Sequence, residues 1–265
     1  HNSIIGNRNM IDFREGVIIC INKPYKASSF GALAFVRTRI SRALDIRRAK
    51  MGHAGTLDPL ATGVLILCTG KATKRIEELQ LNDKEYTATL QFGATTASFD
   101  MEHPESEWFE KDHITEAMLR DALQQFVGDI DQVPPIFSAC NVNGKRAYQL
   151  ARKDREVELK AKKIHIEEIE LLWFDDEKKQ AQIRVVCGKG TYIRALARDI
   201  GRALNSGAYL TQLCRTRVGQ YTLDDCLTYD NFDEWLEAQE LAPWVEENQG
   251  SAQNNKKNKS QRNKE

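Results

Sequence analysis

The segment from Gly52 to Gly63, with the sequence GHAGTLDPLATG, combines residue types that suit chemistry on a bound ligand. It holds one carboxylate, Asp58, five residues after His53, and no other ionisable side chain. Glycines let a backbone approach a ligand closely or adopt positive φ angles. The proline after Asp58 restricts itself and its predecessor. The segment therefore predicts a rigid loop that presents a single aspartate, although an ordinary Asp-Pro turn between a helix and a strand has the same pattern.

Other kinds of site have weaker support. The stretch from Gly63 to Lys71 is like a P-loop, but six residues separate its glycines instead of about four, and Ala72 stands where Ser or Thr would bind magnesium. The other histidines lack ligand spacing, and no Asp/Glu cluster offers a two-metal site, so we predict no metal. No Ser or Cys has an obvious base partner in the sequence. Asp58 is therefore the candidate nucleophile.

Charge is segregated along the chain, although the formal net charge is zero. Residues 14–75 contain twelve Lys and Arg against three acidic residues, whereas residues 221–249 contain nine Asp and Glu and no Lys or Arg. A basic face can therefore coexist with a neutral total, which permits nucleic-acid binding. No apolar stretch reaches the roughly 20 residues of a membrane span. The six cysteines are scattered without a C-x-x-C pair, so we expect a reduced, cytoplasmic protein that binds no membrane.

The apolar patterns predict an α+β fold with a mixed, largely antiparallel central sheet and flanking helices, because strands and helices follow each other without regular βαβ alternation. Residues 93–113 are expected to form a loop. The expected strands cover residues 16–21, 64–68, 86–92, 164–173, 181–187 and 212–221. The first expected helix begins at Ser28 or Ser29 and runs to Leu44. Further helices are expected over residues 71–79, 115–127, 146–153, 193–204 and 232–240.

The glycine-rich segment also resembles the catalytic loop of a known family. GHAGTLDPLATG is similar to that loop in the TruB-type tRNA pseudouridine synthases, which isomerise a uridine in the T-arm of tRNA. The similarity covers roughly residues 14–228. Further matching segments occur in the same chain order and are Asn22-Lys23-Pro24, Lys84-Glu85-Tyr86, Val133-Pro134-Pro135-Ile136-Phe137-Ser138-Ala139, Gly144-Lys145-Arg146-Ala147-Tyr148, Gly190-Thr191-Tyr192-Ile193-Arg194 and Leu213-Cys214-Arg215-Thr216.

The resemblance implies the pseudouridine synthase fold and conversion of the uridine at tRNA position 55, without a cofactor and with flipping of the target base. Asp58 corresponds to the family's nucleophile, Tyr86 to the tyrosine that stacks on the flipped base, and Arg194 to the arginine that pairs with the aspartate. His53 corresponds to the histidine near the extruded base, and Lys23 to a lysine near the active cleft. Each of the last four residues also has an ordinary interpretation, as a core tyrosine, a surface arginine, a loop histidine or a turn lysine.

The expected partner is tRNA, bound through its T-arm stem-loop by a monomeric enzyme. Recognition of a folded stem-loop depends mainly on shape, backbone phosphates and unpaired bases. Cations close in sequence to the Asp58 loop, and a second group in the middle of the chain, are the candidate contacts to the RNA backbone. These are Arg37, Arg39, Arg42, Arg47, Arg48 and Lys50, with Lys145, Arg146 and Arg152 as the second group.

Four segments are expected along the chain, without the full PUA domain that many relatives carry. They are an N-terminal extension (1–13), the pseudouridine synthase catalytic domain (14–230), an acidic helical segment (231–249) and a disordered basic tail (250–265). The chain departs from the family pattern at Lys26, where glycine is usual, and at Ala97, Phe99 and Asn141.

Two other functions remain open. A tRNA-binding and refolding protein with secondary catalysis would use the same basic surface, but the intact set of Asp58, Tyr86 and Arg194 favours an enzyme. A glycosidase with an aspartate nucleophile is disfavoured, because retaining sugar hydrolysis needs a second carboxylate about 5 Å away and the motif supplies none.

Overall fold

The computed structural model describes residues 10–137, 141–142, 145–146 and 159–246. Its centre is a mixed sheet in which β12 pairs with β3 in parallel and the other neighbours are antiparallel. The predicted α+β class with a largely antiparallel sheet is confirmed. In spatial order the strands are β1 (Ile18–Lys23), β3 (Ala61–Thr69), β12 (Ala208–Val218), β4 (Lys84–Phe92), β11 (Gln180–Cys187), β10 (Lys162–Asp175) and β7 (Gly128–Gln132).

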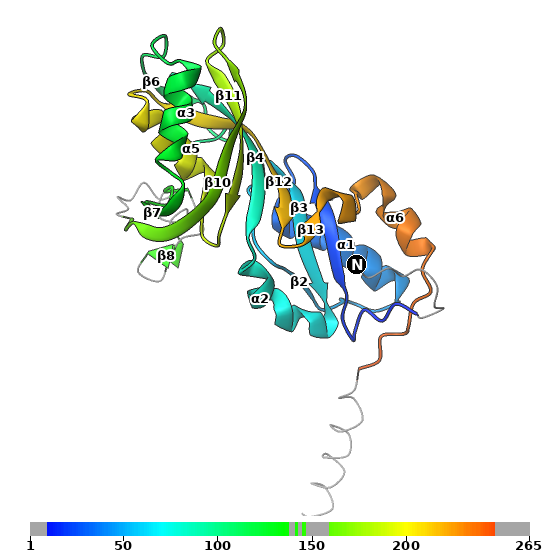
Figure 1. Ribbon diagram of the computed structural model, residues 1–265. Helices are drawn as coiled ribbons and strands as arrows, with labels where there is room; N and C mark the ends of the chain where they lie inside the picture. Colours follow the sequence, from blue (N-terminus) through cyan, green and yellow to red (C-terminus); the bar gives the residue numbers. More distant parts are fainter. Residues whose placement is uncertain (1–9, 138–140, 143–144, 147–158, 247–265) are drawn as a thin grey trace, which may run out of the picture.

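Different helices cover the two halves of this sheet (Figure 1). In one half, α1 (Ser29–Ala43) and α6 (Tyr229–Glu237) contact each other, and α1 also contacts β1 and the short strand β2 (Met51–His53), which pairs with β3. In the other half, α3 (Glu116–Gln124) packs on β10 and α5 (Ile193–Ala203) packs on β12 and β4. The two halves meet along β12, β3 and β4, where the chain brings the Asp58 loop and the start of α5 together.

Helix α1 forms as its sequence predicts. The Ser28 hydroxyl accepts the backbone N–H of Gly31 at 2.8 Å, which satisfies a donor that the first helical turn leaves unpaired. Leu33, Val36 and Ile40 recur at helical spacing and are buried against the sheet. Of the two candidate caps, Ser28 is therefore the N-cap of the helix. The hydroxyl of the neighbouring Ser29 instead binds the Asp58 loop.

The expected loop over residues 93–113 is wrong in part, because it contains an antiparallel pair, β5 (Ala94–Thr96) and β6 (Glu105–Trp108). All four residues of β6 are exposed, so the strand lacks the apolar alternation that would have revealed it. The edge strand β7 was also unexpected, because its exposed Asp129 and Asp131 leave Ile130 as its only apolar side chain. Short strands with few apolar side chains are therefore not recognised from the spacing of apolar residues in the sequence.

Shorter elements refine the remaining expectations. The helix expected over 71–79 is a 3-10 turn, Gly70–Arg75, followed by α2 (Ile76–Gln80). The last expected strand is divided into β12 and the short β13 (Tyr221–Thr222), and a 3-10 turn, Leu223–Asp225, follows. The helix expected over 146–153 lies almost entirely outside the described residues. Its first residue instead ends β9 (Lys145–Arg146), which pairs with β8 (Asn141–Val142).

Both ends of the described chain contribute to the core. Phe13, from the expected N-terminal extension, is fully buried, and Ile11 exchanges backbone hydrogen bonds with the 240–242 segment. Phe232 and Leu236 of α6 are buried in the same apolar cluster. Residues 11–13 and the acidic helix therefore pack on the α1 half of the sheet. The expected basic tail lies outside the described residues.

Candidate active site

The Asp58 loop connects β2 to β3 and is held at both ends by backbone geometry. Gly63 has φ of +112°, and a Cβ there would lie 2.1 Å from the backbone oxygen of Arg215, where β3 pairs with β12. Only glycine fits that close approach of two strands. Before Asp58, the Ser29 hydroxyl accepts from the Leu57 N–H and donates to the Leu57 carbonyl, both at 2.8 Å. The backbone of the loop is therefore fixed directly beside its aspartate.

Two buried cations bind backbone carbonyl groups of the same loop and of the strand β3 that follows it. Arg215, on β12, donates from Nε to Val64 O at 2.9 Å and from Nη2 to Gly55 O at 3.1 Å. Lys23, at the end of β1, is fully buried and donates from Nζ to Pro59 O at 3.1 Å and to two carbonyls of its own turn. Burial lowers the pKa of Lys23 to about 8, although the nearby Asp58 carboxylate opposes that shift. Both side chains therefore hydrogen-bond to backbone carbonyl groups at the loop.

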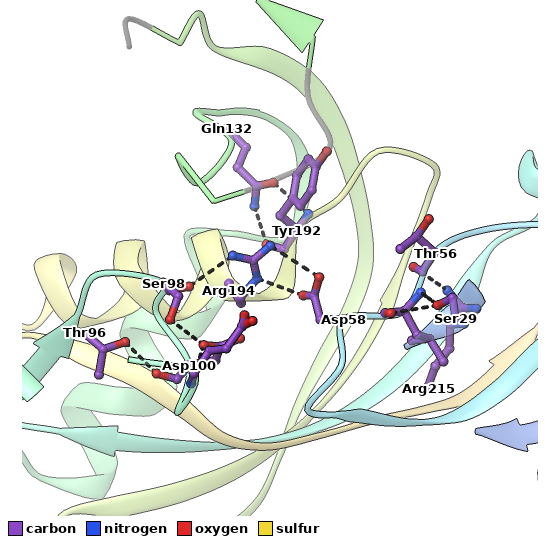
Figure 2. Close-up of polar contacts among 12 residues, drawn as sticks. Ser29, Thr56, Asp58, Thr96, Ser98, Asp100, Gln132, Tyr192, Arg194 and Arg215 are labelled. Carbon is purple, nitrogen blue, oxygen red and sulfur yellow. Dashed lines mark hydrogen bonds and ion pairs between the residues drawn. The ribbon is translucent and has the colours of Figure 1, made fainter. Parts of the chain in front are cut away.

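Asp58 is paired with Arg194, the second residue of α5 (Figure 2). Arg194 Nε donates to Asp58 Oδ2 at 2.8 Å, while Nη2 lies 3.5 Å from Oδ1. The arginine side chain is 5% exposed and the aspartate 35% exposed. The guanidinium therefore holds the carboxylate in one orientation through a bidentate contact. The rest of the carboxylate stays accessible to a ligand.

Arg194 is itself held in place, directly by Ser98 and indirectly by contacts of Ser98 and of the first residues around α5. Its Nη1 donates to the Ser98 carbonyl at 3.1 Å, and the Ser98 hydroxyl donates to the Asp100 carboxylate at 2.5 Å. The start of α5 is held by Gln132, whose side-chain amide both accepts from Tyr192 N at 2.9 Å and donates to Tyr192 O at 3.2 Å. Figure 2 shows these residues arranged around the guanidinium. The arginine is thus positioned from two separate segments.

A pocket opens at this pair. Its lining combines the two charged partners with apolar and polar side chains from β12 and from the segment after β5. The lining residues are Asp58, Leu60, Ala61, Asp100, Met101, Arg194, Leu210, Thr211, Gln212 and Leu213. The site therefore presents one oriented carboxylate at a concave surface, where it can act as a nucleophile or as a base.

Tyr86 lies on β4, and His53 lies at the end of β2, directly before the Asp58 loop. Tyr86, on β4, is 9% exposed and stands in register with Arg215. Burial raises the pKa of its phenol, so the ring stays neutral. His53 ends β2, and burial together with the positive charge of Arg215 lowers its pKa. Its Nδ1 is buried without a hydrogen-bond partner among the described residues, which is consistent with a neutral imidazole.

The cations of the first candidate RNA-binding group differ in exposure and in their contacts. Four members of this group are exposed: Arg42 in the last turn of α1, and Arg47, Arg48 and Lys50 between α1 and β2. Arg39 differs, because its Nε is 2.9 Å from the Asp233 carboxylate of α6 and its guanidinium covers the Phe35 ring. It therefore joins α1 to α6 and is less available to phosphate than its neighbours.

Arg37 and the second group complete the set. The Arg37 guanidinium lies 5.7 Å from the centre of the Phe30 ring. Lys145 and Arg146 form β9, of which only the backbone course is described, and Arg152 lies outside the described residues.

Sequence reasoning missed Arg215, Gln132 and Ser98 as parts of the site. Arg215 had a signal, since the segment Leu213-Cys214-Arg215-Thr216 was among the family-like stretches, but its buried contacts to the loop carbonyls could not be inferred from it. Gln132 contacts the backbone of Tyr192, which is 60 residues away in the sequence, and Ser98 contacts the guanidinium of Arg194, which is 96 residues away. No local sequence pattern indicates such contacts.

The family follows from comparisons with known proteins. Residues 42–193 match the family described as TruB family pseudouridylate synthase (N terminal domain), and residues 194–246 match the tRNA pseudouridylate synthase B C-terminal domain. The chain belongs to the TruB family. As a member it is an isomerase that converts uridine to pseudouridine in tRNA.

Relatives in the TruB family align over most of the chain. The tRNA pseudouridine synthase B of Phocaeicola vulgatus is 57% identical over 237 residues, which are 89% of this chain and 100% of the relative. That of Flavobacterium johnsoniae is 44% identical over 227 residues, 85% of this chain and 98% of the relative. A chain of the solved Cbf5-Nop10-Gar1 complex is 27% identical with a TM-score of 0.62, over 85% of this chain but only 56% of that longer one.

The described residues contain neither a metal-binding cluster nor a membrane-spanning helix. No group of three or more His, Cys, Asp or Glu side chains is placed to hold a metal ion. No helix in the same part of the chain is long and apolar enough to cross a membrane.

Proposed function

We propose that this enzyme converts the T-loop uridine at tRNA position 55 to pseudouridine, with Asp58 as the group that initiates the reaction. The observation that carries the proposal is the open side of the Asp58 carboxylate, which is held by Arg194 at 2.8 Å at the edge of a pocket. The Arg194 guanidinium holds both carboxylate oxygens in one orientation, which an attacking or proton-abstracting group requires.

The reaction moves one bond and conserves all atoms. The C1′–N1 glycosidic bond of the uridine breaks, the uracil rotates within the pocket, and a C1′–C5 bond forms. The C5 proton leaves and N1 gains a proton, so no oxidant, reductant or hydrolytic water is consumed and no cofactor is required. Asp58 serves by attacking C1′, by attacking C6 or by acting as a base, and all three roles use the same oriented carboxylate.

The target base must leave its stack to reach Asp58. In this proposal Tyr86 supplies the apolar surface on which the flipped uracil rests, and the neutral His53 lies near the space that the base vacates. Lys23 stabilises the loop through the Pro59 carbonyl and does not itself contact the substrate. The enzyme works as a monomer in the cytoplasm, with the exposed cations after α1 binding the phosphates of the T-arm.

Mapping the product of the purified protein tests the proposal. An unmodified tRNA transcript is incubated with excess enzyme, and pseudouridine is located by a chemical label that stops reverse transcription. We expect one stop at position 55, and none in a transcript that carries cytidine there. A product at another uridine would refute the T-loop assignment, and no product in any tRNA would refute the activity of this chain.

A further inference from the structure

The turn between β1 and α1 is bound to the catalytic loop on both sides of Asp58. Lys26 N donates to the Pro59 carbonyl at 2.8 Å, directly after the aspartate. Ser29 binds Leu57, directly before it. The turn of residues 24–29 therefore lies directly beside the loop that carries Asp58.

Two aromatic rings on this turn are exposed to solvent. Tyr25 is 51% exposed and Phe30 is 62% exposed, although large apolar side chains normally contribute to a core or an interface. Phe35, one and a half turns further along α1, shows the alternative, because it stacks on Tyr229 of α6 at 3.9 Å. Within the described residues, the Tyr25 and Phe30 rings stack on no other ring.

Positive charge accompanies both rings. Lys26 Nζ and the Arg37 guanidinium each lie 5.7 Å from the centre of the ring beside them, Tyr25 and Phe30 respectively. Arg48 adds its charge nearby, since partial burial and the Arg48 guanidinium together lower the pKa of Arg37. An aromatic ring beside a cation suits an unpaired nucleotide, because the base can stack on the ring while the cation binds the phosphate.

We propose that Tyr25 and Phe30, with Lys26 and Arg37 beside them, form an aromatic rim on which an unpaired base of the tRNA loop, adjacent to the target uridine, stacks. The inference rests on the proposed function, because it assumes that the target uracil enters the pocket at Asp58. Extraction of that uracil removes a stacking partner from its neighbour. The aromatic rim replaces that partner within the same protein segment that orients the catalytic loop.

Binding of unmodified tRNA to single-ring variants gives the first test. Base–aromatic stacking typically changes affinity by about 5- to 100-fold when one ring is removed, and we expect an increase of the Kd in this range for Phe30→Ala or Tyr25→Ala. Phe30→Trp should retain the wild-type Kd and Phe30→Leu should not, because leucine keeps apolar area but has no ring face. Trp173→Ala removes an exposed ring on β10 and serves as the matched control.

The position of the stacked base gives the second test. A stem-loop with 2-aminopurine placed next to the target uridine should lose fluorescence when the wild type binds, and Phe30→Ala should abolish that loss. Thermal melting checks that the variants are folded. Unchanged Kd and unchanged quenching in the Tyr25→Ala, Phe30→Ala double variant would overturn the aromatic rim and would assign the exposed rings to another partner. Failure of the proposed function is distinguishable, since the wild type would then form no pseudouridine at position 55 whatever the rings bind.

Discussion

Two regions of this enzyme carry cations in opposite environments. Around the Asp58 loop, Lys23, Arg194 and Arg215 are buried and hydrogen-bonded to named backbone carbonyls or to Asp58 itself. Between α1 and β2, Arg47 and Lys50 are exposed, and no ion pair is found for either within the described residues.

The difference shows how one charge type can have two functions. A buried guanidinium or ammonium stabilises a single geometry, because every donor that loses its partner in a dry environment raises the free energy of the fold. Exposed cations keep their hydration and their freedom, and they attract a polyanion over a Debye length without fixing its position. We therefore expect substitutions in the buried region to affect rate and stability, and substitutions in the exposed region to affect binding.

The largest effect among these supporting cations is expected at Arg194. Arg194→Ala removes the partner that orients Asp58 and leaves the Ser98 carbonyl without its donor, so the single-turnover rate at saturating tRNA should fall by about 100- to 1,000-fold. Arg194→Lys keeps the charge but loses the fork of donors and should recover only part of the rate. Arg202→Ala, an exposed arginine of the same helix, is the control. A normal rate in Arg194→Ala would show that the pair is not used in catalysis.

Lys23 should affect stability and its pH dependence. Lys23→Met deprives the Ala27 and Pro59 carbonyls of a donor, and the free energy of unfolding at pH 7 should fall by roughly 2 kcal/mol. In the wild type the folded pKa near 8 lies below the ordinary value of 10.5, so the unfolded chain binds more protons between these pH values. Wild-type stability therefore gains up to about 1.4 kcal/mol per pH unit from this group as pH rises from 8 to 10.5, and loses it as pH falls back.

Urea titrations at several pH values measure this contribution. The Lys23→Met protein should lack the gain between pH 8 and 10.5, whereas Lys74→Met, at an exposed lysine, should retain it. Equal pH slopes in wild type and Lys23→Met would mean that Lys23 titrates normally and is not held as described.

Neutralising the exposed region should weaken binding with little effect on the chemical step. In a triple variant, Arg47→Gln, Arg48→Gln and Lys50→Gln, the Kd for tRNA should rise by roughly 10-fold and the slope of log K against log salt should flatten by about two to three. The rate at saturating tRNA should stay near the wild-type value. A matched triple change at Arg120, Lys178 and Arg202, all exposed in the other half, should leave the slope unchanged. A wild-type salt slope in the first variant would locate the RNA on another face.

The smallest effect is expected at Lys26, an exposed cation whose backbone is strained. Its φ of +72° is in the left-handed region, which costs a residue with a Cβ about 1–2 kcal/mol. Lys26→Gly removes that cost but increases the entropy of the unfolded chain, so the net gain in unfolding free energy should be up to about 1 kcal/mol. Lys74→Gly, at a residue without positive φ, should destabilise instead. A loss of stability in Lys26→Gly would mean that contacts of the lysine side chain outweigh the strain.

The sequence predicted the parts of the fold that carry an apolar period or a cap. Strands β1, β3 and β4 and helix α1 lie where their patterns indicated, within a few residues at the ends. Strands β6 and β7 were missed because β6 is exposed along its whole length and β7 has Ile130 as its only apolar side chain. At Lys26 the family's usual glycine is explained by the positive φ, which a single sequence does not reveal.

The site was only partly accessible to the same reasoning. Asp58 could be singled out locally, because its loop combines glycine, proline and one carboxylate. Its contact with Arg194 spans 136 residues, so the pairing came from the family resemblance and not from any pattern in this chain. Arg215 was not recognised, since a buried arginine that binds backbone carbonyls looks like any strand arginine until the fold brings the loop to it.

We propose that Asp58 performs the chemistry and that the cations around it position it or bind RNA. Asp58→Asn tests this claim most directly, because it keeps the size of the side chain and removes its nucleophilic charge. The measurement is the single-turnover rate of pseudouridine formation together with the Kd for the same unmodified tRNA. We predict that pseudouridine formation becomes undetectable while the Kd stays within a few-fold of the wild-type value. A loss of affinity as large as the loss of rate, or a variant that still forms pseudouridine, would contradict the account.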